Sequence, residues 1–457
     1  MPYNRKSGRM ESARSTGHVP IAQSDFVKER LRSFRVAAAG TMPNIDGGLL
    51  SEATTLGEAS ADPVRWAMSF DGSPQEVAVR EEYPSTRIGY IQVAAVLVHL
   101  EEMLGQEAAY FVDPAVIRAA TSEALHSIVL PSSNVCRQDM SSVRDSWRAE
   151  IFEIFRDYQV EETSLLDIFM LLVDFSDKRT GQGSIVAARC SANDACNARN
   201  ISVPRSGIDC AQCGGRIFPT DALRVHEEVT EEHPNITALT RLMTVLEHIT
   251  MVGYLHFLFQ RQPRVLGNVA FVGDGPLALF GPQAWLHTPI LAFIHDLSAR
   301  LAAQQMRSPV IVGLEKTGQF AEHAAAIGES IPRQTLMALP DSYIYGHVLT
   351  FRAAAGVEYG RDTYYGRKFF YRTARGQMLT LTIPKPNQSI SDPHNPVHFP
   401  MMRDTLAFLD RIGTALYQDA VIPVALAHSF ASIPLRTGSK VLRLLSQEFL
   451  SATNPPP

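Results

Sequence analysis

Cysteine is scarce in this chain, with five residues among 457, and the number is odd. A fold held together by disulfides needs more cysteines, in pairs, so that class of secreted scaffold is excluded. The first 20 residues are polar and lack the apolar segment of a secretory signal. We therefore expect a reducing, cytoplasmic setting.

Long apolar runs and excess positive charge are also missing. No uninterrupted run reaches the roughly 18 residues typical of a membrane span, so we expect no membrane contact. The 42 Lys and Arg residues are outnumbered by 47 Asp and Glu residues, which excludes coating of nucleic acid by bulk charge but not a local basic groove. A Walker A pattern is absent, so any ATP-driven motor must be a separate partner.

The remaining composition is that of a globular protein, 45% hydrophobic and 19% charged, and the length predicts two or three structural units. Strand-like runs alternate with helical periodicity, which indicates an α/β fold with a helical, cysteine-bearing insertion. We expect four parts: an N-terminal extension with one helix at 1–60, the first part of the core at 61–100, a helical insertion at 101–235, and the second part of the core at 236–457.

Two short segments repeat one pattern, an apolar strand followed by Asp-Gly. They are WAMSFDGS, with a strand expected over Val64–Phe70, and VAFVGDGPL, with a strand expected over Asn268–Gly273. An aspartate at the end of each buried strand can project into a cleft, and Mg²⁺ or Mn²⁺ is held by such carboxylates. The alternative for either segment alone is a simple turn, because Asp-Gly is a common turn sequence.

A third segment, PVALAHSFASI at residues 423–433, completes a resemblance. Together with FDGS and DGPL, in this order, it resembles the three signature regions of the NurA nuclease family. That resemblance implies an RNase H-like mixed sheet flanked by helices, and a homodimeric DNA nuclease dependent on Mn²⁺ or Mg²⁺. It also implies partnership with a HerA-like hexameric ATPase in DNA end processing and repair or in phage defence.

The resemblance implies four site residues, matched one by one. Asp71 and Asp274 match the aspartates of the first two regions, and His428 matches the histidine of the last. Glu247, in the predicted helix 236–260, is the best match for a glutamate that holds metal, with Glu227, Glu228, Glu231 and Glu232 as competitors. The alternatives are a solvated helix face for Glu247 and a structural histidine for His428.

Four basic residues are candidates for contact with DNA. Arg367 and Lys368 lie in TYYGRKFFYRT, where cations interleave with aromatic rings that can stack on bases. A strand with rings inward and cations outward fits this stretch equally well. Lys316 follows the strand PVIVG and matches a family lysine near the active site, although a surface lysine is as plausible. Arg87, past the first aspartate, either touches phosphate or pairs with a carboxylate.

The cysteines form two pairs in a polar segment at about 183–220. Cys190 and Cys196 enclose five residues, and Cys210 and Cys213 enclose two in the sequence CAQCGG. Four thiolates at this spacing favour a closed, structural Zn²⁺ site in a zinc-ribbon-like module; free thiols or a disulfide are the alternative. Because four ligands leave no open position, we do not expect catalysis from this zinc.

Two functions therefore follow from the sequence. The first is a metal-dependent DNA nuclease that cleaves phosphodiester bonds by two-metal hydrolysis. The second is a catalytically weak DNA- or protein-binding adaptor on a nuclease-like core. An RNA-directed hydrolase on a similar fold is a third possibility, which substrate choice between RNA and DNA separates.

Overall fold

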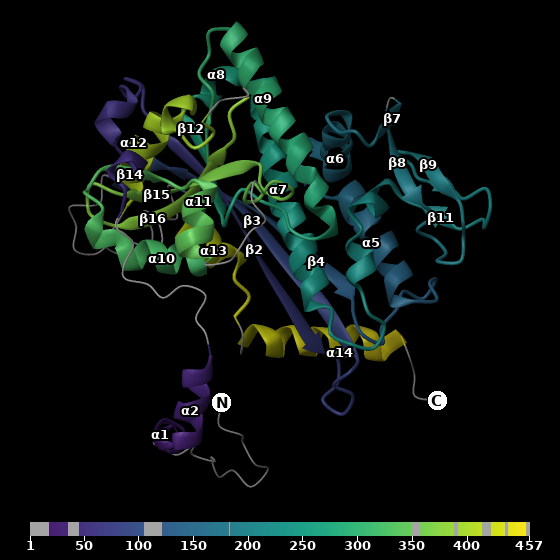
Figure 1. Ribbon diagram of the computed structural model, residues 1–457. Helices are drawn as coiled ribbons and strands as arrows, with labels where there is room; N and C mark the ends of the chain where they lie inside the picture. The colour runs from purple at the N-terminus through teal and green to yellow at the C-terminus, as the bar shows by residue number, and fades with distance from the viewer. Residues whose placement is uncertain are drawn as a thin grey trace.

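The computed structural model describes residues 18–34, 45–104, 121–181, 183–349, 357–387, 392–413, 422–434 and 437–453. A large twisted sheet lies at the centre, helices cover both of its faces, and a smaller cysteine-bearing module lies to one side (Figure 1). The expectation of an α/β protein with a large mixed sheet flanked by helices is confirmed.

Nine strands form the central sheet, in the order β1-β14-β15-β16-β13-β12-β2-β3-β4. Only β12 pairs in parallel with its two neighbours, β2 and β13, and every other pairing is antiparallel. The strands span Leu50–Glu52 (β1), Trp66–Ala78 (β2), Arg87–His99 (β3), Thr121–Pro131 (β4), Val269–Asp274 (β12), Val310–Glu315 (β13), Thr335–Ala338 (β14), Gly366–Arg372 (β15) and Met378–Pro384 (β16).

The alternation of side chains along β2 builds a separate core on each face of the sheet. Met68 and Phe70 point toward one face and pack with residues of four helices, α5, α6, α7 and α9. Ala67 points toward the other face and packs with residues of α12 and α13. These helices span Val143–Asp157 (α5), Leu165–Asp174 (α6), Ile236–Arg261 (α7), His287–Ala303 (α9), Met402–Ile412 (α12) and Ile422–Ala431 (α13).

The remaining helices are short, except α14 near the end of the chain. Helix α14 crosses the β2-β3 hairpin, where Tyr90 bonds to Ser446 at 2.7 Å and Gln75 bonds to Ser439 at 2.7 Å. These helices span Val19–Gln23 (α1), Asp25–Ser33 (α2), Leu100–Leu104 (α3), Pro263–Leu266 (α8), Gln319–Ile327 (α10), Asp341–Tyr343 (α11) and Thr437–Thr453 (α14).

Helix α7 is the longest in the described part of the chain and confirms the helix expected over 236–260. By length and composition alone it is long and apolar enough to cross a membrane, and no other helix among the described residues passes that test. Of its most apolar window, 56% is buried inside the protein. Its contacts with β2 and β3 are those of a core helix.

Three expectations about the elements are wrong. The strand expected to end at Phe70 continues to Ala78, because β3 pairs with it residue by residue along its whole length. The helical insertion expected over 101–235 contributes β4 to the edge of the sheet. Within the described residues of the extension expected over 1–60, α1 and α2 lie where one helix was expected, and β1 joins the opposite edge of the sheet.

The cysteine-bearing module is built from short strands joined by tight turns. One sheet contains β7, β8 and β9, and a second pair contains β10 and β11. Its strands span Arg179–Gly181 (β7), Ser184–Arg189 (β8), Arg199–Pro204 (β9), Ile208–Asp209 (β10) and Arg216–Ile217 (β11), and a two-stranded hairpin, Gln159–Val160 (β5) and Thr163–Ser164 (β6), joins α5 to α6. Strands this short bury little apolar surface, so the module needs another source of stability.

Candidate active site and metal centres

Asp71 and Asp274 lie on neighbouring parallel strands. The paired register of β2 and β12 ends with Phe70 opposite Gly273, so the next residue of each strand is one of the two aspartates. Both side chains point toward the α13 face of the sheet, by the same alternation that turns Ala67 and Val272 toward that core. After Asp274 the chain leaves the sheet through Gly275, whose φ of 128° favours glycine.

His428 reaches this pair from α13. Its Nδ1 lies 2.8 Å from Oδ2 of Asp71, and 62% of its side chain is exposed. Two residues past the end of α13, Ile433 donates its N–H to the hydroxyl of Ser73 at 3.3 Å, a second bond between this segment and β2. The hydrogen bond between His428 and Asp71 joins residues 357 positions apart in the chain.

Glu247 approaches from α7, on the opposite face of the sheet. Its carboxylate and the side chain of Met243 pack against the backbone of Gly72, where a Cβ atom would lie 2.9 Å from Oε1 of Glu247. Glu247 and Asp274 also line one small cavity, together with His248. Glycine next to the first aspartate is therefore what lets the glutamate come close.

Lys316 follows β13 and completes the cluster. Its Nζ lies 2.7 Å from Oδ2 of Asp274, and both side chains are about one fifth exposed. Lys316, which the sequence resemblance places near the active site, thus lies beside Asp274.

Burial and mutual repulsion dominate the electrostatics of the carboxylates. Desolvation raises the pKa of Asp71, the nearby charge of Asp274 raises it further, and the bond from His428 opposes both. Burial also raises the pKa of Glu247 well above its ordinary value, and the charges of Asp71 and Asp274 add to that effect. A bound cation would stabilise the ionised forms of Asp71 and Glu247.

The donor set fits a hard divalent cation. One ligand atom each from Asp71, Asp274 and His428 lies within 4.8 Å of the others, close enough to share an ion. The two carboxylates suit Mg²⁺ or Mn²⁺, and the imidazole nitrogen is a ligand more typical of transition-metal ions. Glu247 lies outside that trio but lines the adjoining cavity. The arrangement can hold a cation beside a phosphate, and Lys316 offers a second positive charge.

The other residues expected to contact DNA lie elsewhere. Arg367 and Lys368 are buried and paired, Arg367 with Glu358 at 2.7 Å and Lys368 with Glu315. The stretch is a strand with its rings buried, as one interpretation expected, but its two cations do not face water. As arranged here they offer no exposed cation to a phosphate. Arg87 pairs with Glu76 at 3.3 Å. It lies opposite Ala78, seven residues along β2 from Asp71, which is ~23 Å in a strand.

The four alternatives to Glu247 lie far from both aspartates in the sequence. Among the described residues, none of the four forms a hydrogen bond or ion pair with Asp71 or Asp274. Glu227 bonds to Arg189 and Arg224 in the cysteine module. Glu231 accepts the N–H of Val143 at 2.8 Å, at the start of α5. Glu247 is thus the glutamate that α7 brings to the site.

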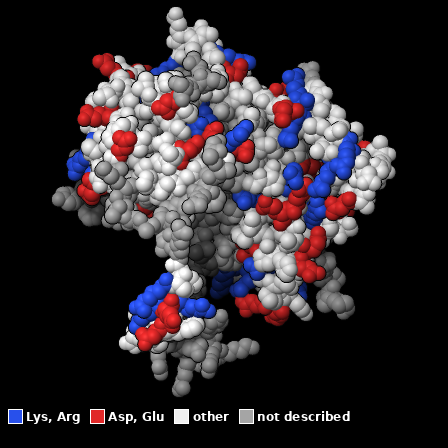
Figure 2. Space-filling view, in the orientation of Figure 1, with Lys and Arg blue, Asp and Glu red and all other residues white. Residues whose placement is uncertain are grey.

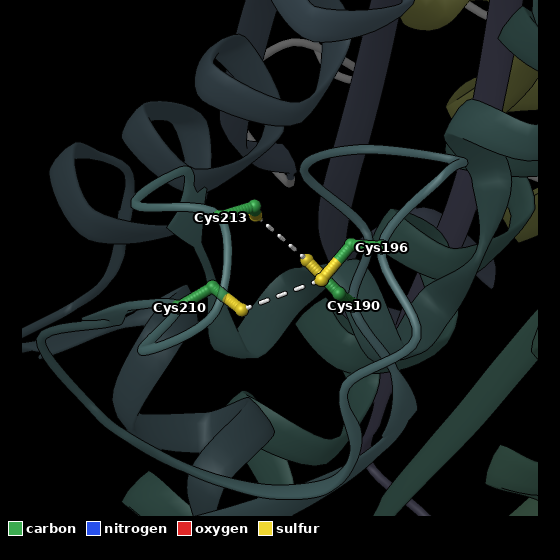
Figure 3. A group of neighbouring side chains, drawn as sticks. All are labelled: Cys190, Cys196, Cys210 and Cys213. Carbon is green, nitrogen blue, oxygen red and sulfur yellow. Dashed lines mark hydrogen bonds between the residues drawn. The ribbon is translucent and has the colours of Figure 1, made fainter.

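The four paired cysteines converge in the module (Figure 3). The sulfur atoms of Cys190 and Cys213 are 3.7 Å apart, as are those of Cys196 and Cys210, and all four lie within 4.8 Å of one another. Separations near 3.7 Å are far longer than a disulfide bond. Backbone N–H groups of Cys213 and Gln212 lower the pKa of Cys210 to about 7, which favours the thiolate that binds metal. Cys136, the fifth, is also a free thiol.

Comparisons with known proteins add little to this geometry. No family model matches the chain, and no curated protein matches it. Among solved structures, the chain is similar to one described as "Crystal structure of NurA", at 9% identity, with 96% of each chain covered and a TM-score of 0.26. A likeness at that TM-score carries no argument about fold or activity, so the case for function depends on the site.

Proposed function

We propose that this protein is a metal-dependent DNA nuclease that hydrolyses phosphodiester bonds with Mn²⁺ or Mg²⁺. The observation that supports it most is the convergence of Asp71, Asp274 and His428 on one point at the end of β12, with Glu247 and Lys316 beside it. The sequence resemblance to NurA nucleases supports DNA as the substrate and an RNase H-like classification of the core.

Asp71, Asp274 and Glu247 would hold the catalytic cations, and His428 would complete their ligands or orient the attacking water. The cations would supply an activated water and stabilise negative charge on the phosphate, the chemistry of two-metal hydrolysis. The chain's own residues do the positioning. Gly72 donates its N–H to Oδ1 of Asp71 at 2.8 Å, which fixes the carboxylate.

Lys316 is suited to the substrate itself. A cation held by Asp274 would take up the charge of that carboxylate, and the ammonium group of Lys316, which bonds to it at 2.7 Å, would then be placed to contact the scissile phosphate. A serine or cysteine nucleophile is not required, since water attacks the phosphorus directly.

The experiment is cleavage of linear duplex and single-stranded DNA with Mn²⁺, with Mg²⁺ and without added metal. We expect cutting by the wild type and a loss of at least about 10³-fold for Asp71→Asn and for Asp274→Asn, because the ligands of the cation are removed. Asp296→Asn on α9 is the matched control, since that aspartate pairs with Arg300 on the surface. A wild type that cuts no DNA, even with a HerA-like ATPase added, would refute the nuclease and favour the adaptor.

Partnership and assembly are proposed from the sequence resemblance alone. We propose that the nuclease acts as a homodimer with a HerA-like hexameric translocase, in DNA repair or in phage defence. Co-purification with the ATPase and a molar mass by light scattering test the two parts separately.

For the cysteine cluster we propose a structural Zn²⁺ held by Cys190, Cys196, Cys210 and Cys213. Four sulfurs within reach of one centre, in a module with little apolar core, support it. We expect one equivalent of zinc in the purified protein by mass spectrometry, and its loss with unfolding of the module in Cys210→Ser. Cys136→Ser is the control and should retain the metal. Cleavage-competent protein that contains no zinc would contradict this assignment.

A further inference from the structure

A cleft rich in positive charge lies next to the cysteine cluster, away from the carboxylate site. Five basic side chains line it, contributed by α5, the loop before β7, the ends of β8 and β9, and the turn before residue 225: Arg144, Lys178, Arg189, Arg199 and Arg224. Figure 2 shows Lys and Arg side chains gathered, among acidic ones, over the part of the surface where β8 and β9 lie in Figure 1. The sequence analysis did not single out any of these five residues.

Two of the arginines face each other in a way that costs stability. Arg189 and Arg199 are direct partners in the antiparallel register of β8 and β9. Like charges in such a position repel, since their Cβ atoms are only ~5 Å apart. The loop between the two strands carries Cys190 and Cys196, so the same metal site that closes the hairpin also holds the two cations together. An anion lying across the hairpin would relieve the repulsion.

Acidic partners inside the cleft neutralise only part of this charge. Glu227 alone serves two guanidinium groups, Arg189 at 3.1 Å and Arg224 at 2.6 Å. Burial works against ionisation of Glu227, but the bonds from Arg224 and Arg189 lower its pKa to about 2, so it stays charged. Arg144 pairs with Asp194 at 2.8 Å.

The other two cations are uncompensated. Among the residues that the structure describes, neither Lys178 nor Arg199 forms an ion pair. Lys178 Nζ lies 5.2 Å from the ring centroid of Trp285, and Arg199 is exposed at the start of β9. Asp221, also in the cleft wall, is committed to the buried Arg148 at 2.7 Å. Among the described residues, the cleft therefore offers two positive charges that no carboxylate pairs with.

The segment that forms one wall of the cleft contacts the helix that carries Glu247. Glu228, next to the cleft residue Glu227, faces Arg241 of α7 at 3.6 Å. Arg241 lies six residues before Glu247 on the same helix, a rise of ~9 Å. Glu228 also faces Gly281, in the segment that follows Asp274. These contacts join the wall of the cleft to the helix that carries Glu247 and to the segment that follows Asp274.

We propose that this cleft binds the sugar-phosphate backbone of the DNA strand that the carboxylate site cuts. The inference rests on the proposed nuclease function. It adds a binding surface for the part of the DNA strand that lies outside the cleavage site. Contacts of cations with phosphates carry no sequence information, so binding here is independent of base sequence and weakens as salt is raised.

The test measures binding without cleavage. An Asp71→Asn protein in buffer without added metal or chelator is titrated into a fluorescein-labelled single-stranded oligonucleotide, and Kd is followed by anisotropy over a range of salt. We expect Lys178→Ala combined with Arg199→Ala to weaken binding about tenfold. The slope of log affinity against log salt should fall by about 1.4, since each lost phosphate contact removes roughly 0.7.

Two further proteins serve as controls. Arg264→Ala removes an exposed arginine on α8, outside the cleft, and should leave Kd and the slope as they are. Arg199→Lys keeps the charge and should restore much of the affinity lost by Arg199→Ala. Because Lys178 and Arg199 form no ion pair, the double variant should keep its zinc content and its circular dichroism spectrum.

Several outcomes would overturn the proposal. One is a double variant that binds DNA no more weakly than Arg264→Ala does. Another is a poly-glutamate peptide that binds the wild type more tightly than the oligonucleotide and is alone weakened by the double variant, which would assign the cleft to an acidic protein. Failure of the wild type to cut DNA refutes the nuclease but not backbone binding, so the two failures are distinguishable.

Discussion

The two candidate metal centres of this protein are assembled in opposite ways. The cysteines lie within one short segment, with Cys190 and Cys213 only 23 positions apart. The carboxylate site joins β2, α7, β12 and α13, and its bond between Asp71 and His428 spans 357 positions. Spacing along the sequence is therefore enough to predict the first centre, whereas the second depends on the register of a sheet and the packing of two helices.

The largest expected effect tests whether the stability of the cysteine module depends on contacts with α5. Arg148 of α5 is buried and bonds to Asp221 at 3.1 and 2.7 Å, and to the backbone carbonyl of Arg216 at 2.6 Å. Arg148→Ala leaves a buried carboxylate unpaired, so we expect about 3–5 kcal/mol less stability in urea unfolding. The exposed Arg156→Ala, on the same helix, should cost less than about 1 kcal/mol. Equal effects of the two variants would show that the module does not depend on α5.

A smaller effect is expected from Gly72→Ala, which tests how closely the long-range site is packed. The added Cβ would lie 2.5 Å from Cγ of Met243 and 2.9 Å from Oε1 of Glu247. Moving the carboxylate of Glu247 away from the aspartates should lower kcat roughly 100-fold. In contrast, a Cβ at Gly273 would meet nothing within 4 Å, so Gly273→Ala should retain most activity in the same assay. If the two alanine variants were equally active, close packing at Gly72 would not matter.

The smallest expected effect concerns the lysine beside Asp274. Lys316→Ala removes a charge-assisted contact of the kind that contributes roughly 1.5 kcal/mol or more. We expect about a tenfold fall in kcat/KM for DNA cleavage at saturating Mn²⁺, with the melting temperature unchanged because the lysine is partly exposed. Lys316→Arg should retain more activity. A Lys316→Ala enzyme as active as the wild type would remove this residue from the mechanism.

Much of the fold could be predicted from local patterns. The strands β12, β13, β15 and β16 and the helix α7 follow from apolar runs and helical periodicity that lie entirely within each element. Both aspartates were found in the same way, because each follows a buried apolar run. The cysteine cluster needed only the spacing of its four thiols.

What local patterns could not predict depends on partners elsewhere in the chain. FDGSP is typical of a turn, yet β2 continues through it because β3 pairs with all thirteen residues. The edge strand β4 has polar and helix-favouring residues, and its pairing with β3 decides its structure. Arg367 and Lys368 can be buried because two carboxylates neutralise them, Glu358 from the segment before β15 and Glu315 from the end of β13.

The basic cleft had one local signal. Arg189 and Arg199 flank the first cysteine pair nearly symmetrically, in the sequence RCSANDACNAR. Strands that enter and leave a metal-closed loop pair with each other, so residues at its two ends become neighbours. Charge next to the cysteines was therefore a better guide to an anion site than charge among aromatic residues.

The position of His428 also bears on how the protein is made. The ribosome synthesises the two aspartates, α7 and the whole cysteine module before it reaches α13, which begins at Ile422. Domains fold as they emerge, from the N-terminus onward, so the sheet can form while the histidine is still missing. A chain interrupted before α13 would carry both aspartates but lack the hydrogen bond to Asp71. Completion of the site is thus tied to synthesis of the chain through α13.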